Sequence, residues 1–363
     1  MSFEPLDRHI GTPCEDEEHM TTVDNPLEPA TPAIEAVMRG DESAFADLTR
    51  LYRRELHVHC YRMLASFEDA EDLVQEAFLR AWQKRETLRG RGSFRAWLYR
   101  IATNACLDFL AKHQRRVVEL AATGASSDAV HVPHVAWLQP YPDRLLEQAA
   151  PADAGPDAAV ARRETIELAF IVAMQYLPPK QRAVLILRDV LDWSAAEAAM
   201  LLESSVPAVN GALQRARETL QRHRPKRDAP AAAGGVAEEE RRLIQAYVEA
   251  TERCDADELV RLLSADARFT MPPAPMAFVG SRTVVRSWVE GGFGAPPFDD
   301  FKCLVTRANG MPAIANYVRE PGQTHHQAFA VDVLRIEHGR ITEVTAFDLA
   351  TLLGAFALPA TLA

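Results

Sequence analysis

The sequence contains few cysteines and places them far apart. There are five in 363 residues, none in a Cys-x-x-Cys pair: Cys14, Cys60, Cys106, Cys254 and Cys303. This spacing argues against a disulfide framework and against a zinc finger. His57 and His59 lie beside Cys60, but no fourth ligand stands at a familiar spacing. We therefore expect a packed helix here, with no metal and no cofactor.

Long apolar runs are also missing. The chain has no apolar stretch of about 18 residues, which predicts no membrane-spanning helix and no membrane partner. The first residues lack the apolar core of a signal peptide and are acidic at Glu15, Asp16, Glu17 and Glu18. We therefore expect a cytoplasmic protein.

Basic residues are outnumbered by acidic ones, 40 to 51, and the net charge of −11 alone argues against nucleic-acid binding. The charges nevertheless fall in blocks. Residues 65–79 hold five acids and no base, residues 80–116 hold ten bases and two acids, and residues 207–227 hold six bases and one acid. Two basic blocks in an acidic chain indicate two local surfaces that attract phosphate.

Composition and periodicity divide the chain into six segments. These are a disordered acidic N-terminus (1–31), a helical block (32–116), a linker rich in Ala, Pro and Asp (117–162), a second helical block (163–224), a flexible linker (225–235) and a C-terminal segment (236–363). In the last segment, helices are followed by strand-like runs. This order predicts an α+β domain whose helices pack on one face of a curved sheet. The expected fold class is multidomain, with two all-α domains and a C-terminal α+β cone.

A strong helical period covers residues 69–82. Its apolar stripe is typical of a helix on a core and comprises Ala70, Leu73, Val74, Ala77, Phe78, Ala81 and Trp82. A second face is acidic with an apolar edge and comprises Glu68, Asp72, Gln75, Glu76 and Leu79. Such a face suits a basic helical partner, although on this segment alone a solvated face is the simpler interpretation.

The next helix is predicted from Ser93, an N-cap residue, to Lys112. One side of it is apolar, and the other presents Arg95, Tyr99, Arg100, Thr103, Asn104 and Asp108. The preceding loop, 87–92, contains two glycines, which let a backbone approach a ligand closely. The arginines attract phosphate, and Tyr99 and Asn104 have the chemistry to stack on or hydrogen-bond an unpaired base.

Residues 177–220 predict a helix and then a helix-turn-helix. Pro178 and Pro179 open the first helix, Ser194 caps the second, and residues 203–205 form the turn. The expected inner face of the third helix comprises Val206, Val209, Leu213, Ala216 and Leu220. The expected outer face, which would enter a major groove, comprises Ala208, Asn210, Gly211, Gln214 and Arg215. Arg217, Arg222 and Arg224 are candidates for phosphate contacts.

The run DAEDLVQEAFLRAW, followed by GSFRAWLYRIATNACLDFL, resembles region 2 of sigma-70 factors of the extracytoplasmic-function (ECF) group, over residues 34–116. The resemblance implies a protein that binds RNA polymerase core and directs it to promoter DNA. It implies contact with the β′ clamp helices through Asp69, Asp72, Gln75, Glu76 and Leu79. It implies that the 87–93 loop and the next helix read the −10 element through Arg95, Tyr99, Arg100, Asn104 and Asp108.

The helix-turn-helix resembles region 4 of the same group, which implies −35 recognition and a contact with the polymerase β subunit. The implied −35 residues are Ser205, Ala208, Asn210, Gly211, Gln214, Arg215 and Arg217. The chain departs from the family where Glu203 stands at a position usually held by Gly. Its outer face at residues 210–212 is also less basic than in relatives, which shifts weight to Gln214 and Arg215.

The linker segment VAWLQPYPDRLLEQ contains an apolar cluster that predicts docking onto another domain or onto polymerase: Trp137, Tyr141, Leu145 and Leu146. Residues 240–350 resemble the SnoaL-like family, which includes cyclases, isomerases and many non-catalytic domains. The acid/base candidates are His325, His326, Asp332 and Asp348. A solvated sheet face is the favoured interpretation of these residues, so no catalytic residue is predicted. The domain order resembles an ECF subgroup whose extension regulates the sigma domains in place of, or besides, an anti-sigma protein.

Two other functions compete with a sigma factor. A ligand-responsive helix-turn-helix regulator would leave the acidic helix and the 87–116 block without a role. An enzyme of the SnoaL-like type fused to a DNA-binding module would need a buried acid paired with a base in its pocket.

Overall fold

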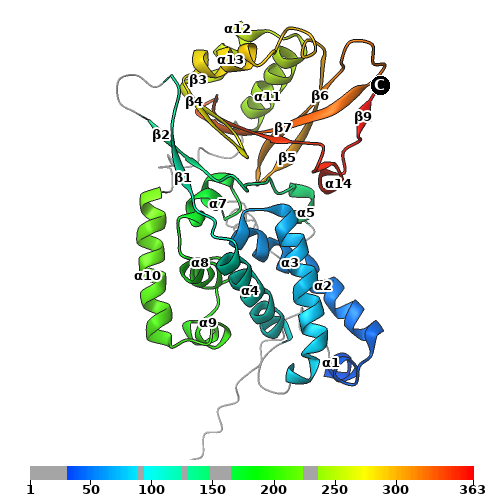
Figure 1. The fold of residues 1–363 in the computed structure, drawn as a ribbon, viewed down its shortest axis with the longest axis vertical. Helices are drawn as coiled ribbons and strands as arrows, with labels where there is room; N and C mark the ends of the chain where they lie inside the picture. Colours follow the sequence, from blue (N-terminus) through cyan, green and yellow to red (C-terminus); the bar gives the residue numbers. More distant parts are fainter. Residues whose placement is uncertain (1–30, 89–93, 125–129, 148–164, 224–235) are drawn as a thin grey trace, which may run out of the picture.

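The computed structural model describes residues 31–88, 94–124, 130–147, 165–223 and 236–363. The predictions for residues 1–30, for most of the 87–93 loop, for Arg224 and for the linker 225–235 lie outside these residues. Figure 1 shows the C-terminal domain above two groups of helices, with the segment that joins those groups lying between all three parts.

The first group contains α1 (Thr31–Met38), α2 (Glu42–Leu64), α3 (Phe67–Gln83), a 3-10 turn (Arg85–Leu88) and α4 (Phe94–Lys112). Side chains cap the starts of two helices, because Asp41 accepts from the Ala44 amide at 3.0 Å and Ser66 from the Asp69 amide at 3.3 Å. Most of the predicted stripe of α3 faces the core: Ala70, Leu73, Val74, Ala77 and Ala81 are buried, and Phe78 packs against the core. Trp82 is half-buried.

The second group contains α7 (Leu168–Gln175), α8 (Pro179–Leu185), a π-helical turn (Ile186–Val190), α9 (Ala195–Leu201) and α10 (Val206–His223). Ser194 and Glu197 form a capping box at the start of α9, as two reciprocal hydrogen bonds of 2.7 and 3.1 Å. Val209, Leu213 and Ala216 of α10 are buried as predicted. The prediction for Val206 is wrong: it is 40% exposed, because the start of α10 is uncovered from residue 203 to residue 208 and burial begins only at Val209.

The segment between the two groups has secondary structure of its own. It forms a hairpin of β1 (Val118–Ala121) and β2 (His131–His134), and then the short helix α5 (Asp143–Glu147). Beyond β1, Thr123 donates to the Ala277 carbonyl at 2.9 Å and accepts from the Val279 amide at 3.0 Å. The segment predicted as a linker therefore extends the sheet of the C-terminal domain at one edge, where Figure 1 shows β1 beside β4.

The C-terminal domain begins with α11 (Val236–Glu252) and α12 (Ala256–Leu262) and also contains α13 (Ser281–Glu290) and α14 (Leu353–Phe356). Its strands are β3 (Leu263–Met271), β4 (Ala274–Val279), β5 (Phe301–Ala308), β6 (Met311–Val318), β7 (His326–Glu337), β8 (Arg340–Asp348) and β9 (Thr361–Leu362). The strand order is β4-β3-β8-β7-β6-β5, with β9 on β7 and only β3–β8 parallel among the described pairs. The predicted α+β architecture of the C-terminal domain is confirmed.

The two faces of this sheet belong to different cores. Ala315, Tyr317, Val331 and Val333 join the apolar cluster that continues into both helical groups. Other sheet residues, such as Leu334 and Val344, pack against α11–α13 in a second cluster. The sheet thus separates two cores: one face packs toward the two helical groups, and the other packs against α11–α13 inside the C-terminal domain. None of the helices in the described ranges has the length and hydropathy needed to cross a bilayer.

Candidate functional site

The exposed face of α3 is acidic and has an apolar end. Asp72 and Gln75 are exposed, and Leu79 is 60% exposed. Glu76 is partly exposed and accepts from Arg80 at 2.8 Å, and Arg80 also binds Asp108 on α4 at 2.9 Å. These residues form one surface available to a partner.

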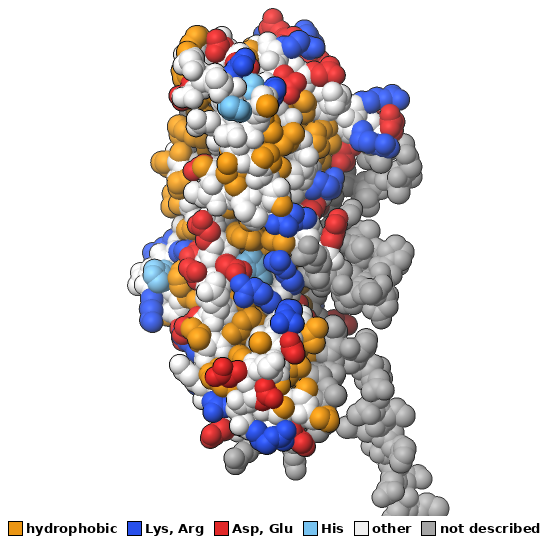
Figure 2. All heavy atoms as spheres, turned by 90° about the vertical axis from the view of Figure 1, so that its right-hand side faces the viewer, with side chains coloured by type: hydrophobic (Ala, Val, Ile, Leu, Met, Phe, Trp, Pro, Cys, Tyr) orange, Lys and Arg blue, Asp and Glu red, His pale blue; other side chains and the backbone are white. Residues whose placement is uncertain are grey.

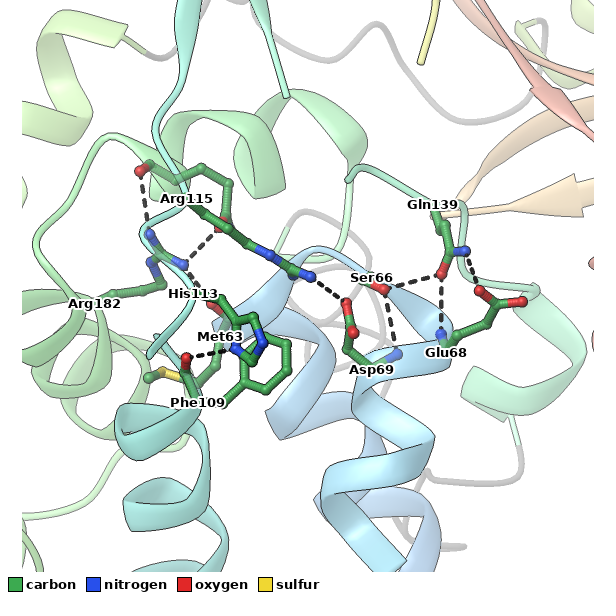
Figure 3. Close-up of polar contacts among 10 residues, drawn as sticks. Met63, Ser66, Glu68, Asp69, Phe109, His113, Arg115, Gln139 and Arg182 are labelled. Carbon is green, nitrogen blue, oxygen red and sulfur yellow. Dashed lines mark hydrogen bonds and ion pairs between the residues drawn. The ribbon is translucent and has the colours of Figure 1, made fainter. Parts of the chain in front are cut away.

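Asp69 lies apart from that surface. Its carboxylate accepts from Arg115 at 2.8 Å, and the Arg115 guanidinium also lies over the Phe109 and Trp137 rings. Figure 3 shows this contact at the start of α3. Asp69 is therefore paired within the chain, as Glu76 is, but its side chain is only 25% exposed, against 43% for Glu76.

An open apolar groove lies beside Leu79. It is lined by Glu42, Phe45, Arg53, Gln75, Phe78, Leu79 and Trp82, and it encloses about 440 Å³. Phe45 and Trp82 come from different helices, and their ring centroids are 5.2 Å apart. Sequence reasoning assigned Phe78 and Trp82 to the core alone and did not consider Phe45. The apolar periodicity of each helix does not predict the groove between α2 and α3, because it reports only which side of one helix is apolar.

The segment between the helical groups fastens the start of α3. The Gln139 side chain accepts from the Glu68 amide and from the Ser66 hydroxyl, both at 3.0 Å, and donates to the Glu68 carboxylate at 2.8 Å. Figure 3 shows Gln139 reaching Ser66 and Glu68 from the linker. The exposed α3 face is thus held in place by a residue outside the first helical block.

The α4 face predicted to meet the −10 element is only partly exposed. Asn104 is exposed, Arg100 is half-buried, and Asp108 has a 57% exposed side chain. The prediction that Tyr99 and Thr103 face outward is wrong. Tyr99 is 1% exposed and Thr103 is fully buried, with its hydroxyl 2.9 Å from His59 Nε2.

Trp193, in the turn before α9, covers this part of α4. Its ring centroid lies 5.3 Å from that of Tyr99, and the centroid of the His59 ring lies 5.0 Å from that of Tyr99. Arg95 binds Glu55 at 3.1 Å and lies over both Tyr99 and Trp193. Tyr99 is thus buried by a tertiary contact, because the second helical group packs on the first.

A buried arginine joins the same two groups. Arg182 of α8 donates to the Met63 carbonyl at the end of α2 and to Gln175 Oε1 at 2.6 Å. It also donates to the carbonyls of Gln175 and Leu177, each at 3.1 Å. Burial lowers the pKa of this guanidinium to about 9. The helix carbonyls at the end of α2 carry partial negative charge, which offsets part of that desolvation.

The outer face of α10 is open. Ala208, Asn210, Gln214 and Arg215 are exposed, and Gly211 is half-buried. Ser205 caps the helix by accepting from the Ala208 amide at 3.3 Å. Arg217 makes a two-pronged ion pair with Asp189 at 2.6 and 2.8 Å, while its side chain stays 61% exposed. Glu203, in the turn, has a φ of +50°, which is a glycine-type conformation.

The four linker anchors lie at the junction of the C-terminal domain and the helices. Tyr141 and Leu145 are buried, and Trp137 and Leu146 are half-buried. Asn309, in the β5–β6 turn, is fully buried: its side chain accepts from the Tyr141 amide at 2.7 Å and donates to the Tyr61 hydroxyl and the Ile166 carbonyl at 2.9 and 2.7 Å. Sequence reasoning missed Asn309, whose only signal is an Asn-Gly turn.

The four acid/base candidates of the C-terminal domain differ in their exposure and do not lie in one site. His325 and Asp348 are exposed. His326 is 2% exposed and lies 2.9 Å from Asp300, and Asp332 lines a cavity. The expectation of a solvated sheet face is therefore wrong for His326 and Asp332, because β9 and the helices cover those parts of β7. His326 does not line the Asp332 cavity.

Comparison with known proteins agrees with this architecture. The family Sigma-70 region 2 matches residues 48–116, Sigma-70 region 4 matches 167–220, and the SnoaL-like domain matches 244–344. The ECF RNA polymerase sigma factor SigG of Mycobacterium tuberculosis is 42% identical over 325 residues, which cover 88% of this chain and 85% of SigG. The ECF sigma factor SigW of Bacillus subtilis is 31% identical over 191 residues, or 52% of this chain and 93% of SigW.

Among solved structures, the ECF sigma factor SigJ of Mycobacterium tuberculosis aligns over 87% of this chain and 99% of its own, with a TM-score of 0.53 and 23% identity. That similarity concerns the fold. The identity to SigG, the matches to both sigma regions and the exposed helix faces together show that this chain belongs to the ECF RNA polymerase sigma factors.

Proposed function

We propose that this sigma factor acts in the cytoplasm, binds RNA polymerase core through the exposed face of α3, and recognises promoter DNA with α4 and α10. The support for the polymerase surface is the combination of Asp72, Gln75 and Glu76 with the 60% exposed Leu79 and its adjoining groove. An acidic face with an apolar anchor fits a basic helical partner, such as the β′ clamp helices.

The contacts between the two helical groups support the further proposal that this arrangement is a closed state. The carrying observation is Trp193, which covers Tyr99 and Arg95 on the proposed −10 face. Gln214 and Arg215, on the proposed −35 face, stay exposed. In this state the two promoter surfaces differ in accessibility, and opening requires α9 to leave α4.

We propose that the C-terminal domain regulates this opening. Asn309 binds residues from the linker, from α2 and from the segment before α7, so one turn contacts all the parts that have to separate. Asp143 adds a contact by accepting from the Gly310 amide at 2.8 Å. The intramolecular contact takes the place of an anti-sigma protein, or acts besides one.

We propose no catalytic role for the C-terminal domain. Within the described residues, Asp332 is the single carboxylate that lines its cavity, and no histidine, lysine or arginine joins it. The pairing of a buried acid with a base, which would indicate an acid–base site of two residues, is therefore not found among the described lining residues.

The polymerase surface is tested by reversing its charge. The double variant Asp72→Lys, Glu76→Lys should fold normally, because both positions are at least partly exposed, and should lose core binding. Co-purification with core polymerase measures this. The matched control reverses Glu249 and Glu290, two exposed acids of the C-terminal domain. Core binding at wild-type strength by the α3 variant would remove the assignment.

A further inference from the structure

The first turn of α3 is held by a residue of the linker. The side chain of Gln139 accepts from the Glu68 amide at 3.0 Å and donates to the Glu68 carboxylate at 2.8 Å. The Gln139 backbone is fixed as well, because its amide donates to the Ala65 carbonyl at 3.0 Å and its carbonyl accepts from the Tyr61 hydroxyl at 2.8 Å. Gln139 therefore binds the turn between α2 and α3 through both its side chain and its backbone.

A cation binds the next carboxylate of the same turn. Arg115, which follows α4, donates to Asp69 at 2.8 Å. Its guanidinium carbon lies 4.9 Å from the centroid of the Phe109 ring and 5.4 Å from that of Trp137, two residues before Gln139 in the linker. Figure 3 shows Arg115 and Gln139 reaching the first turn of α3 from two sides. We refer to Arg115, Trp137 and Gln139 together as the α3 latch.

The latch occupies carboxylates that a basic partner of α3 would need. Asp69 was predicted from the family resemblance to contact polymerase, and Glu68 belongs to the acidic face of the same helix. A carboxylate that is already paired offers less to a second cation. Asp72 and Gln75, further along the face, are exposed. The acidic face therefore has an occupied first turn and an open middle.

Cations of the chain itself are common around the helices. On the side that Figure 2 views, acidic and basic side chains are mixed over the lower, helical half of the molecule. A basic partner of these helices has to compete with such internal cations for the carboxylates.

The hydrogen bonding of the latch is incomplete. Arg115 Nη1 and Trp137 Nε1 are buried, and neither donates to a described residue. A buried donor without a partner costs free energy. Burial is the main cause of the lowered pKa of Arg182, and the positive charge of Arg115 lowers that pKa further, so the two guanidinium groups repel each other. Both features make the latch a contact that a stronger partner can displace.

The linker connects the latch to the C-terminal domain over a very short distance in sequence. Tyr141 follows Gln139 by two residues, and its amide and carbonyl are hydrogen-bonded to Asn309 at 2.7 and 2.8 Å. The Tyr141 ring is buried between the first helices, with ring centroids 4.9 Å from Tyr61 and 5.5 Å from Phe67. A movement of Gln139 away from α3 therefore acts on the backbone that holds the β5–β6 turn.

We propose that the α3 latch competes with RNA polymerase for the first turn of α3. Core polymerase binds Glu68 and Asp69 only after Gln139 and Arg115 leave them, and the released linker loosens its contacts with Asn309. Polymerase binding and release of the C-terminal domain are then coupled through the linker. This inference rests on the proposed function, because it requires that polymerase binds the acidic face of α3.

The affinity of the full-length protein for core polymerase tests the competition. Removal of contacts that exist only in the free state should favour the bound state. Gln139→Ala and Arg115→Gln should each bind core about three- to tenfold more tightly than the wild type, roughly the factor that one or two hydrogen bonds contribute. Gln114→Ala and Arg116→Gln, matched changes at exposed positions of the segment after α4, should bind like the wild type. Fluorescence anisotropy of the labelled protein, titrated with core enzyme, measures these affinities.

Hydrogen exchange tests the release of the linker separately. In free Gln139→Ala, the Tyr141 amide should exchange faster than in the free wild type. In the wild-type protein, binding of core should accelerate exchange at the Gln139 and Tyr141 amides. Protection of both amides that core binding leaves unchanged would overturn the proposal, as would wild-type affinity for core in both Gln139→Ala and Arg115→Gln.

The charge-reversed variant Asp72→Lys, Glu76→Lys separates this inference from the proposed function. If that variant loses core binding while both latch variants bind like the wild type, the polymerase surface stands and the latch alone is rejected. If it binds core like the wild type, the polymerase surface is rejected and the latch with it. The melting temperature of each variant checks its folding, and a defect in either Gln139→Ala or Arg115→Gln leaves the other variant as the test.

Discussion

At the scale of single residues, Glu203 occupies a backbone conformation that L residues avoid. Its φ of +50° lies in the left-handed region, and the side chain is exposed. A left-handed residue other than glycine costs about 1 kcal/mol or more. Glu203→Gly should therefore raise the free energy of unfolding by about 1 kcal/mol, measured by urea denaturation. A lower free energy of unfolding in Glu203→Gly than in the wild type would show that Glu203 is not strained in this turn.

Two buried histidines predict a dependence on pH. Desolvation lowers the pKa of His57 to about 4 and that of His59 to about 3. An unfolded histidine, with a pKa near 6.5, binds a proton as the pH falls, while the folded ones stay neutral. The stabilisation is therefore present above pH 6.5 and is lost as the pH falls from there to about 4 for His57 and to about 3 for His59.

The expected loss between pH 7 and pH 5 is about 2 kcal/mol for each histidine. It is measured as the difference in unfolding free energy at the two pH values. His57→Gln should shrink this difference, and replacement of the exposed His113 should leave it unchanged. An equal pH dependence in His57→Gln and the wild type would contradict the assignment.

At the scale of elements, the β5–β6 turn connects the C-terminal domain to three other segments through hydrogen bonds of Asn309. Asn309→Gly keeps its positive φ of 55° and removes three side-chain hydrogen bonds. The C-terminal domain should then separate from the helices more often. Hydrogen exchange should increase at the end of α2 and around Tyr141, and scattering should show a larger radius of gyration. Gln323→Ala, in the exposed β6–β7 turn, is the control; equal exchange in both variants would count against the junction.

Elements were easier to predict than their contacts. The helical period located the core stripe of α3, and the Ser-x-x-Glu pattern located the start of α9, because both signals are local. Tyr99 was misplaced because its cover, Trp193, is almost a hundred residues away in the sequence and no period encodes that meeting. The Asp332 cavity was missed for the same reason: Tyr247, Asn316 and Asp332 come from three elements.

At the scale of the whole molecule, all the parts meet at one junction. A chain truncated near Pro230 loses Asn309 and every other contact of the C-terminal domain. We expect core binding to survive, because the α3 face is far from those residues in sequence and made by the first helical block. Promoter-specific transcription should change, and run-off assays with reconstituted holoenzyme measure it. Identical transcription by both forms would reject a regulatory C-terminal domain.

The linker also touches both outer strands of the sheet. Thr123 pairs with β4 through two backbone hydrogen bonds, and at the other edge Tyr141 accepts from the Asn309 amide at 2.8 Å beside a bridge from Pro142 to Ala308 at the end of β5. Unpaired strand edges are templates for aggregation. The contacts of the linker thus cover part of each edge strand, β4 and β5, and reduce the strand edge that is open to pairing with another chain. A C-terminal domain produced without it would present open edges to other copies of itself, and would be the less soluble part of the protein to express alone.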